Sequence, residues 1–288
     1  MTARSAEADM TRIAPMSYAD LDGRVLEWAA AEGWNPGLDD AEAFLAADPA
    51  GFLMAWVGDE PVAAISAVRH SPSFGFLGLY LCRPEWRGRG HGQAIWQAGL
   101  AHLGDRTVGL DGVVAQQTNY ARAGFVLARR TVRHHGSLAA EPSPRVVPCR
   151  PEHLPAMLRL DAQASGVERT SYLQAWFAAA PARQTLVLEA DGGVVGYGTI
   201  RACRSGAKVG PLHAADPADA ELLLKALAAF APPGGGLYLD IPEPNYAAIS
   251  LVRELGFTPV FETARMYRGP APDEELATVF GEVTLELG

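Results

Sequence analysis

The hydrophobic and polar positions of the chain follow two periods, and the resulting elements occur in the same order in each half. Apolar runs and period-two alternation predict strands, whereas apolar residues repeated every three to four positions predict helices. In the first half we expect strands near 12–14, 52–58, 61–70, 74–82, 107–113 and 125–135, and helices near 18–32, 39–47, 93–103 and before Gly124. In the second half we expect strands near 145–148, 184–190, 193–203, 206–212, 236–241 and from Phe257, and helices near 151–163, 169–178, 217–230 and up to 255. An antiparallel meander followed by strand–helix–strand units predicts the α/β class, with an α+β mixed sheet that carries helices on both faces.

Similar segments recur at an offset of 132 residues. Gly58–Ile65 is a turn followed by an apolar strand, and Ala190–Tyr197 repeats this design. The Gly-Phe pairs that begin at Gly124 and Gly256 share the same offset. These matches indicate an internal duplication. The segment 136–144 between the copies is small, polar and proline-bearing, which is typical of a linker. We therefore expect a first domain over 1–137, a linker over 138–144 and a second domain over 145–288.

The composition is typical of a globular protein, with 49% hydrophobic and 20% charged residues in 288 positions. A net charge of −9 argues against a nucleic-acid or anionic-membrane surface, because such surfaces depend on summed positive potential. The three cysteines, Cys82, Cys149 and Cys203, are too widely spaced for a zinc site and predict free thiols. Met1–Asp9 contains no apolar segment typical of a secretory signal. We expect a cytoplasmic protein.

A glycine- and arginine-rich turn, 83–92, follows the apolar strand 76–82 and precedes a helix. The first N–H groups of a helix have no partner within it, and the helix dipole adds partial positive charge there. Glycines allow a ligand to approach the backbone closely. The turn therefore predicts a site for a pyrophosphate. Its Gly88-x-Gly90-x-Gly92 spacing departs from the G-x-G-x-x-G pattern of dinucleotide-binding folds.

Two motifs of the first half resemble those of the GNAT acetyltransferase superfamily. Arg87-x-x-Gly90-x-Gly92 is similar to its acyl-CoA signature, Q/R-x-x-G-x-G/A, in the same strand–turn–helix context. Tyr120, four positions before Gly124-Phe125, resembles the second motif of the superfamily. The resemblance implies tandem GNAT folds and acetyl-CoA as cosubstrate. The residues expected to bind acyl-CoA are Leu81, Cys82, Arg83, Arg87, Gly88, Arg89, Gly90, His91, Gly92 and Gln93.

The second half resembles a GNAT domain that has lost its cofactor site. Its segment 245–257 follows the second motif, but Val252 stands at the tyrosine position. The region 210–217, where the phosphate turn belongs, has no arginine and no glycine pair. Asp216 there is a good helix N-cap, and its charge would repel a pyrophosphate. We therefore expect one acyl-CoA site, in the first half.

The resemblance implies direct attack of an amine on the acetyl-CoA thioester, without a covalent enzyme intermediate. By its position in the motif, Tyr120 is the candidate acid that protonates the leaving thiolate; the alternative is a core residue beside Gly124. Asp111 is the candidate general base; capping the loop that follows it or pairing with an arginine are equally open roles. Glu27 and His70 are weaker candidates for the base. No group of residues has the spacing of a metal site.

An aromatic, turn-rich loop between the first two helices and the strand end at Tyr80 are expected to form the acceptor pocket. The candidate substrate residues are Trp28, Trp34, Asn35 and Tyr80. The second domain is expected to contribute a wall or lid, with Glu262 or Arg265 as candidates. The segment 283–287 is expected to be an edge strand.

These features favour an N-acetyltransferase that acts on a primary amine of a small molecule. Two alternatives are a protein- or peptide-directed N-acetyltransferase and a non-catalytic acyl-CoA sensor. Expected partners are acetyl-CoA and an amine acceptor, with no nucleic acid, no membrane and no metal. Monomer and homodimer are both open.

Overall fold

The computed structural model describes residues 11–288, so the prediction for Met1–Asp9 lies outside the described residues. The first-half strands are β1 (Thr11–Pro15), β2 (Phe52–Val57), β3 (Glu60–Arg69), β4 (Phe74–Cys82), β5 (Thr107–Val113) and β6 (Val126–Gly136). The first-half helices are α2 (Tyr18–Asp20), the π-helical η1 (Leu21–Val25), α3 (Leu26–Ala31), α4 (Asp40–Ala47), α5 (His91–Leu103) and α6 (Gln117–Arg122). The helix predicted over 18–32 is therefore present as three consecutive segments.

The second half repeats this order of elements. Its strands are β7 (Val146–Pro148), β8 (Arg183–Ala190), β9 (Gly193–Ala202), β10 (Ala207–His213), β11 (Leu237–Pro242), β12 (Thr258–Arg268) and β13 (Val279–Gly281). Its helices are α7 (Leu154–Ser165), α8 (Thr170–Phe177), α9 (Pro217–Leu227) and α10 (Tyr246–Glu254). Among residues 11–288, no helix is long and apolar enough to cross a membrane.

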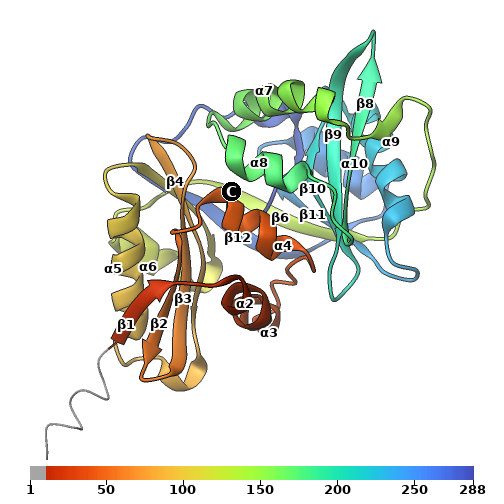
Figure 1. Ribbon diagram of the computed structural model, residues 1–288. Coiled ribbons are helices and arrows are strands. Elements are labelled where there is room, and N and C mark those ends of the chain that lie inside the picture. Colours follow the sequence, from red (N-terminus) through yellow and green to blue (C-terminus); the bar gives the residue numbers. More distant parts are fainter. Residues whose placement is uncertain (1–10) are drawn as a thin grey trace, which may run out of the picture.

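The strands form one continuous mixed sheet in the order β1-β2-β3-β4-β5-β12-β6-β11-β10-β9-β8-β7, and β13 pairs with β10. Helices α5 and α6 lie on the outer side of the first half, and α9 and α10 lie on the outer side of the second (Figure 1). Helices α2–α4, α7 and α8 lie between them (Figure 1). The predicted α/β mixed-sheet class is confirmed.

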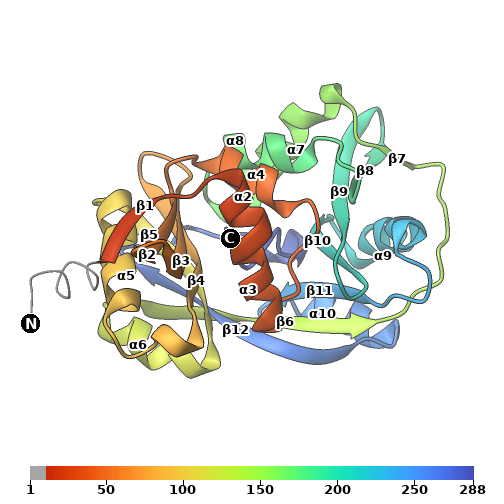
Figure 2. The same cartoon turned by 60° about the horizontal axis from the view of Figure 1, so that its bottom comes forward.

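The two halves exchange their last strands. Strand β12 of the second half pairs with β5 of the first half, from Thr263↔Val113 to Arg268↔Val108. Strand β6 of the first half pairs with β11 of the second, and β6 and β12 pair with each other. Figure 2 shows these two long strands side by side, spanning the molecule between the halves. The boundaries predicted at 137 and 145 stay a prediction, because the exchanged strands join the halves into one sheet.

A pair of buried ion pairs accompanies the exchange. Arg265 on β12 lies opposite Asp111 on β5 and donates to both carboxylate oxygens, at 3.0 and 2.8 Å. Arg133 on β6 lies opposite Asp240 on β11 and donates in the same way, at 2.7 and 2.9 Å. In each pair, the aspartate belongs to one half and the arginine lies on the strand supplied by the other half. A carboxylate and a guanidinium this deeply buried each need the other, because a lone buried charge is costly.

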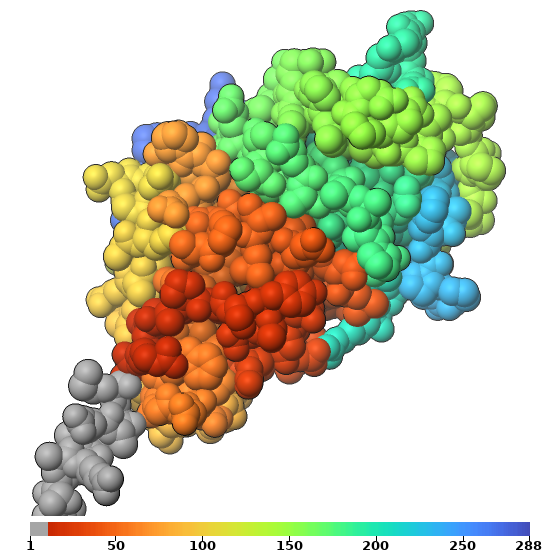
Figure 3. All heavy atoms as spheres, viewed as in Figure 1, coloured from red at the N-terminus to blue at the C-terminus, as the bar shows by residue number. Residues whose placement is uncertain are grey.

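The helices between the halves pack as one core. Phe44 of α4 stacks on Trp176 of α8, with ring centroids 6.1 Å apart, and Tyr172 packs against both rings. All three side chains are almost fully buried. Figure 3 shows α4 and α8 meeting directly at the surface. The halves are thus held by an apolar interface of the kind found inside a domain.

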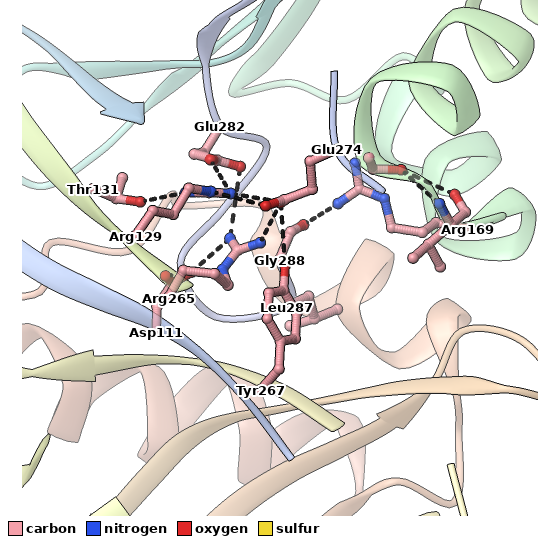
Figure 4. A network of polar contacts seen from close by, with 12 residues as sticks. Asp111, Arg129, Thr131, Arg169, Arg265, Tyr267, Glu274, Glu282, Leu287 and Gly288 are labelled. Carbon is pink, nitrogen blue, oxygen red and sulfur yellow. Dashed lines mark hydrogen bonds and ion pairs between the residues drawn. The ribbon is translucent and has the colours of Figure 1, made fainter. Parts of the chain in front are cut away.

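The last described segment, 279–288, runs through the middle of the molecule and is not the predicted edge strand. Only β13 pairs, with β10, and residues 283–287 form a bend and a turn that are buried except at the partly exposed Leu285. Figure 4 shows the polar contacts that hold this segment: Arg129 pairs with Glu274 and Glu282, and Arg169 donates to the Gly288 carbonyl. The alternation in 283–287 reflects burial between both halves rather than at one face of a sheet.

Candidate active site

A cleft opens where β4 separates from β5. The two strands pair in parallel only from Phe74 to Leu77, opposite Thr107–Leu110. Leu79 then adopts a positive φ of 45°, and the pairing of β4 with β3 shifts register at this point. The separated strand ends leave a cleft with a volume of about 670 Å³. Its walls combine β4, the glycine-rich turn, the end of β5, α6 and residues of the second half.

The glycine-rich turn closes one end of the cleft. Gly90 is the N-cap of α5 and adopts a φ of 90°, a left-handed conformation that strongly favours glycine. It offers no side chain to the first N–H groups of the helix. Arg87 donates to the Cys82 carbonyl at 2.9 Å and pairs with Glu32 at 2.6 Å, which holds the turn against β4 and the first helices. The result is a helix start that faces a cavity, a geometry that suits an anion.

Seven of the ten predicted acyl-CoA residues line the cleft. They are Leu81, Cys82, Arg87, Gly88, Gly90, Gly92 and Gln93. Arg83, Arg89 and His91 do not belong to the lining that residues 11–288 form. Arg83 pairs with Glu60 and Glu85, Arg89 lies over the Trp86 ring at 4.9 Å, and His91 contacts the Thr11 hydroxyl at 2.8 Å.

Tyr120 lies in the cleft wall opposite β4. Its ring stacks on Trp96 of α5, with centroids 5.5 Å apart, and Trp96 also contacts Tyr80. Burial raises the pKa of Tyr120, and the neighbouring Tyr80 raises it further, so the phenol keeps its proton. Burial also raises the pKa of the Cys82 thiol, which does not favour a nucleophilic role for it.

The candidate bases are placed differently. Asp111 contributes to the lining of the cleft, but both of its oxygens accept bonds from Arg265, the pairing role that the sequence left open. Burial raises the pKa of Asp111, and Arg265 opposes that shift. Glu27 pairs with Arg204 at the surface. His70 bonds the Leu287 carbonyl at 2.8 Å, and burial lowers the pKa of His70 to about 3.

Two of the four predicted acceptor residues, Trp34 and Tyr80, line the cleft. Trp28 packs instead against the apolar core. Asn35, with a positive φ of 52°, exchanges hydrogen bonds with the backbone of Ser205, so it ties its loop to the second half.

The second half supplies part of the cleft wall, as the sequence led us to expect, but through residues that the sequence did not identify. Phe261 and Thr263 of β12 line the cleft, as do Leu285 and Glu286 of the last segment. The period-two pattern of 261–267 predicted one buried face, but residues 263–267 are buried on both faces of the sheet, and the suggested Glu262 and Arg265 are not among the lining residues of the described chain. Arg133 of β6 also lines the cleft, although its guanidinium is held by Asp240 and the Trp34 carbonyl.

Comparison with known proteins supports the same fold and chemistry. The Acetyltransferase (GNAT) family matches residues 19–126, and an Acetyltransferase (GNAT) domain matches residues 157–281. Over 268 residues the chain is 33% identical to a holothin acyltransferase from Pseudoalteromonas, and the match covers 92% of this chain and 90% of that protein. The chain belongs to the GNAT acetyltransferase family. It is an acyltransferase of the tandem GNAT type.

Solved structures of GNAT proteins share this fold. A putative acetyltransferase from Pyrococcus horikoshii is 24% identical, with a TM-score of 0.80 over 96% of each chain. A tandem GNAT protein from the clavulanic acid biosynthesis pathway is 19% identical, with a TM-score of 0.62 over 91% of this chain and all of that one.

In the second GNAT domain, the gap that corresponds to the cleft of the first domain is filled. Asp216 caps α9, and its carboxylate accepts a hydrogen bond from Asp219 N at 2.9 Å, as the sequence predicted. Strand β10 pairs with β11 only as far as Val209, after which β13 takes the place beside it. The backbone of Glu282 then bonds the Asp240 carbonyl at 2.8 Å. The chain's own last segment thus occupies the space that corresponds to the cleft of the first GNAT domain.

Within residues 11–288, no group of three or more histidine, cysteine or acidic side chains is arranged to hold a metal ion.

Proposed function

We propose that the chain transfers the acetyl group of acetyl-CoA to a primary amine of a small molecule by direct attack. One observation carries the proposal: a single cleft joins the glycine-rich turn, Tyr120 and a wall from the second half. The turn would hold the pyrophosphate, and the backbone of Leu81 and Cys82 would face the thioester. The amine would enter from the side of Trp34 and Phe261.

The pyrophosphate assignment is tested by a charge placed in the turn. Gly90→Asp adds a carboxylate and a strained φ at the start of α5, so we expect acetyl-CoA binding to be lost. Gly58→Asp is the matched control, because Gly58 also has a positive φ and open space around its Cα, in the β2–β3 turn. Calorimetry on both folded variants measures the effect. Equal acetyl-CoA affinity in the two would reject the assignment.

The acid role of Tyr120 is supported by its place in the cleft and by a pKa that keeps the phenol protonated. Loss of a general acid typically lowers turnover by about 10²–10⁴-fold, so we expect a fall of this order in kcat for Tyr120→Phe. Tyr246→Phe, at an exposed position on α10, is the control. Release of CoA thiol across a panel of amines gives the rate. Undiminished turnover of Tyr120→Phe at all pH values would remove the acid role.

The apolar part of the cleft wall favours a small acceptor over a protein side chain. Phe261, Leu285 and Trp34 form this part, on the side from which the amine would enter. The relative named holothin acyltransferase supports acyl transfer as the reaction. Acceleration of thiol release by peptides but not by small amines would instead favour the protein-directed alternative. Hydrolysis of acetyl-CoA that no amine accelerates would favour the sensor.

We further propose one active domain per chain, the first, and a cytoplasmic location. The filled gap of the second domain and the Asp216 cap support the first point. Three free cysteines support the second, since they fit a reducing compartment.

A further inference from the structure

Glu286 places a carboxylate inside the cleft with one oxygen unused. Its side chain belongs to the cleft lining, and the residue is only 4% exposed. Among residues 11–288, its Oε2 is buried and has no hydrogen-bond partner. A buried carboxylate oxygen normally has several partners, because leaving one unpaired costs free energy. The Glu286 carboxylate therefore has bonding capacity that the fold does not use, in a residue that belongs to the wall of a cleft.

A second unpaired polar atom belongs to the same wall. Thr263 on β12 is 2% exposed, lines the cleft, and its Oγ1 has no partner within the described chain. Beside them lie the apolar Trp34, Phe261 and Leu285 and the charged Arg133, which is held by Asp240 and the Trp34 carbonyl. The acceptor side of the cleft thus combines apolar surface with two buried oxygens that lack a partner, one of them on a carboxylate. This arrangement suits a compact apolar molecule that presents an N–H donor.

Cations lie near Glu286, but none of them forms an ion pair with its carboxylate. Arg133 on β6, Arg201 on β9 and Lys208 on β10 lie near it and interact with its charge. Burial lowers the pKa of Lys208 to about 8, Arg133 lowers it further, and Glu286 opposes the shift. Yet within 4.0 Å these cations pair with other groups: Arg133 with Asp240 and Arg201 with Asp40.

Lys208 Nζ donates to the Trp34 carbonyl at 2.8 Å. Asp111, Arg87 and Glu32 also line this cleft, and each is engaged in its own ion pair or hydrogen bond. Among the carboxylates that line the cleft within residues 11–288, Glu286 is therefore the one without an ion pair.

The backbone fixes where this carboxylate lies. The Glu286 carbonyl packs directly against Gly78 of β4, where a Cβ would overlap it. Ser66 Oγ donates to the same carbonyl at 3.5 Å, and His70 bonds the next carbonyl, that of Leu287. Glu286 is thus held beside the point where β4 bends away from β5, next to the strand end expected to face the thioester.

We propose that Glu286 binds the amino group of the acceptor and receives its proton as the new bond forms. This inference rests on the proposed function. The amine nitrogen attacks the carbonyl carbon of the thioester, the N–C bond forms, and the C–S bond breaks. The proton leaves the nitrogen for the Glu286 carboxylate, and the departing thiolate takes a proton from Tyr120. The products are the amide and CoA, and solvent returns both side chains to their starting protonation states.

Glu286→Gln tests the proposal, because glutamine keeps the shape of the side chain but accepts no proton at neutral pH. We expect kcat to fall about 100-fold or more, the usual effect of losing a proton acceptor, with unchanged acetyl-CoA affinity. The residual rate should rise with pH up to the pKa of the acceptor amine, since only amine already neutral in solution reacts. Glu275→Gln, an exposed carboxylate that precedes β13 and lies outside the cleft lining, is the matched control and should behave as wild type.

Three results overturn the assignment. The first is a Glu286→Gln kcat within about threefold of wild type, far short of the loss of a proton acceptor. The second is a higher KM for the amine with unchanged kcat, which would make Glu286 a binding residue only. The third is a lower kcat with a pH profile of wild-type shape.

Glu286→Asp decides the matter if the glutamine variant does not fold. It keeps the charge but withdraws the carboxylate by one methylene, so kcat should fall at unchanged acetyl-CoA affinity, and full activity overturns the proposal. The proposed function has a separate readout. Wild-type protein that binds acetyl-CoA but acetylates no amine refutes the function, whereas active wild type with fully active Glu286→Gln refutes the role of Glu286 alone.

Discussion

Replacing Asp111 by Asn tests whether Asp111 forms a structural ion pair or acts as the catalytic base. Arg265 donates to both oxygens of Asp111 at 2.8–3.0 Å, and the two side chains are 6% and 0% exposed. Two unit charges about 4 Å apart attract by ~4 kcal/mol at an effective dielectric of about 20. Breaking one partner of a buried pair costs about 3–5 kcal/mol. Glu282 and Glu274 lie 3.6 and 3.8 Å from the guanidinium, so we expect the lower end, about 3 kcal/mol.

Asp240→Asn is the matched variant, since Asp240 forms the same pair with Arg133 on the exchanged strand β6. Asp240→Asn should lower the free energy of unfolding by at least as much as Asp111→Asn does. Urea unfolding of the full chain, followed by intrinsic tryptophan fluorescence, measures both, and each should lower the midpoint by about 1 M or more. Asp111→Asn should also keep its acetyl-CoA affinity while folded. If it retains the wild-type free energy of unfolding but loses turnover, the base role is correct and the reasoning from the ion pair is refuted.

Two other predictions concern packing and pH. Gly78→Ala should lower the free energy of unfolding, measured in urea, by about 1–3 kcal/mol, because the Glu286 carbonyl occupies the space of the new Cβ. It should also lower kcat, because Glu286 has to move. Gly23→Ala, with open space around it, should be neutral or slightly stabilising, and equal stability of the two variants would contradict the packing argument. Burial lowers the pKa of His213 to about 4, below its ordinary value of 6.5, so the folded state should lose stability as pH falls from 6.5 toward 4. His213→Phe should remove about 2–3 kcal/mol of this loss, at ~1.4 kcal/mol per pH unit, and an unchanged pH dependence in urea unfolding would exclude His213 as its source.

The sequence predicted those features of the fold that depend only on residues close together in the chain. The order of strands and helices, the phosphate turn at Gly90 and the Asp216 cap all follow from short segments, and the structure contains them. The exchange of β6 and β12 could not be predicted, because the two strands carry the same pattern and an arginine at equivalent positions. Either strand would satisfy either edge of the sheet by local criteria.

The acceptor side was missed for a similar reason. Glu286 reaches the cleft only because its backbone packs on Gly78, a contact between residues far apart in the chain. In the sequence, the alternation of 283–287 is indistinguishable from that of an edge strand. Its burial depends on the gap left by β4 and β5, which no local signal reveals.

The exchange of strands also sets when the protein is able to finish folding during its synthesis. Strand β5 waits for β12, whose pairing residues emerge about 150 residues later in the chain. At ~5–20 residues per second, its edge stays open on the ribosome for about 8–30 s. During that time β6 also lacks β11, its partner on the other side. An open strand edge is a template for unwanted pairing, so the nascent first half is the stage at which this chain is most exposed to aggregation.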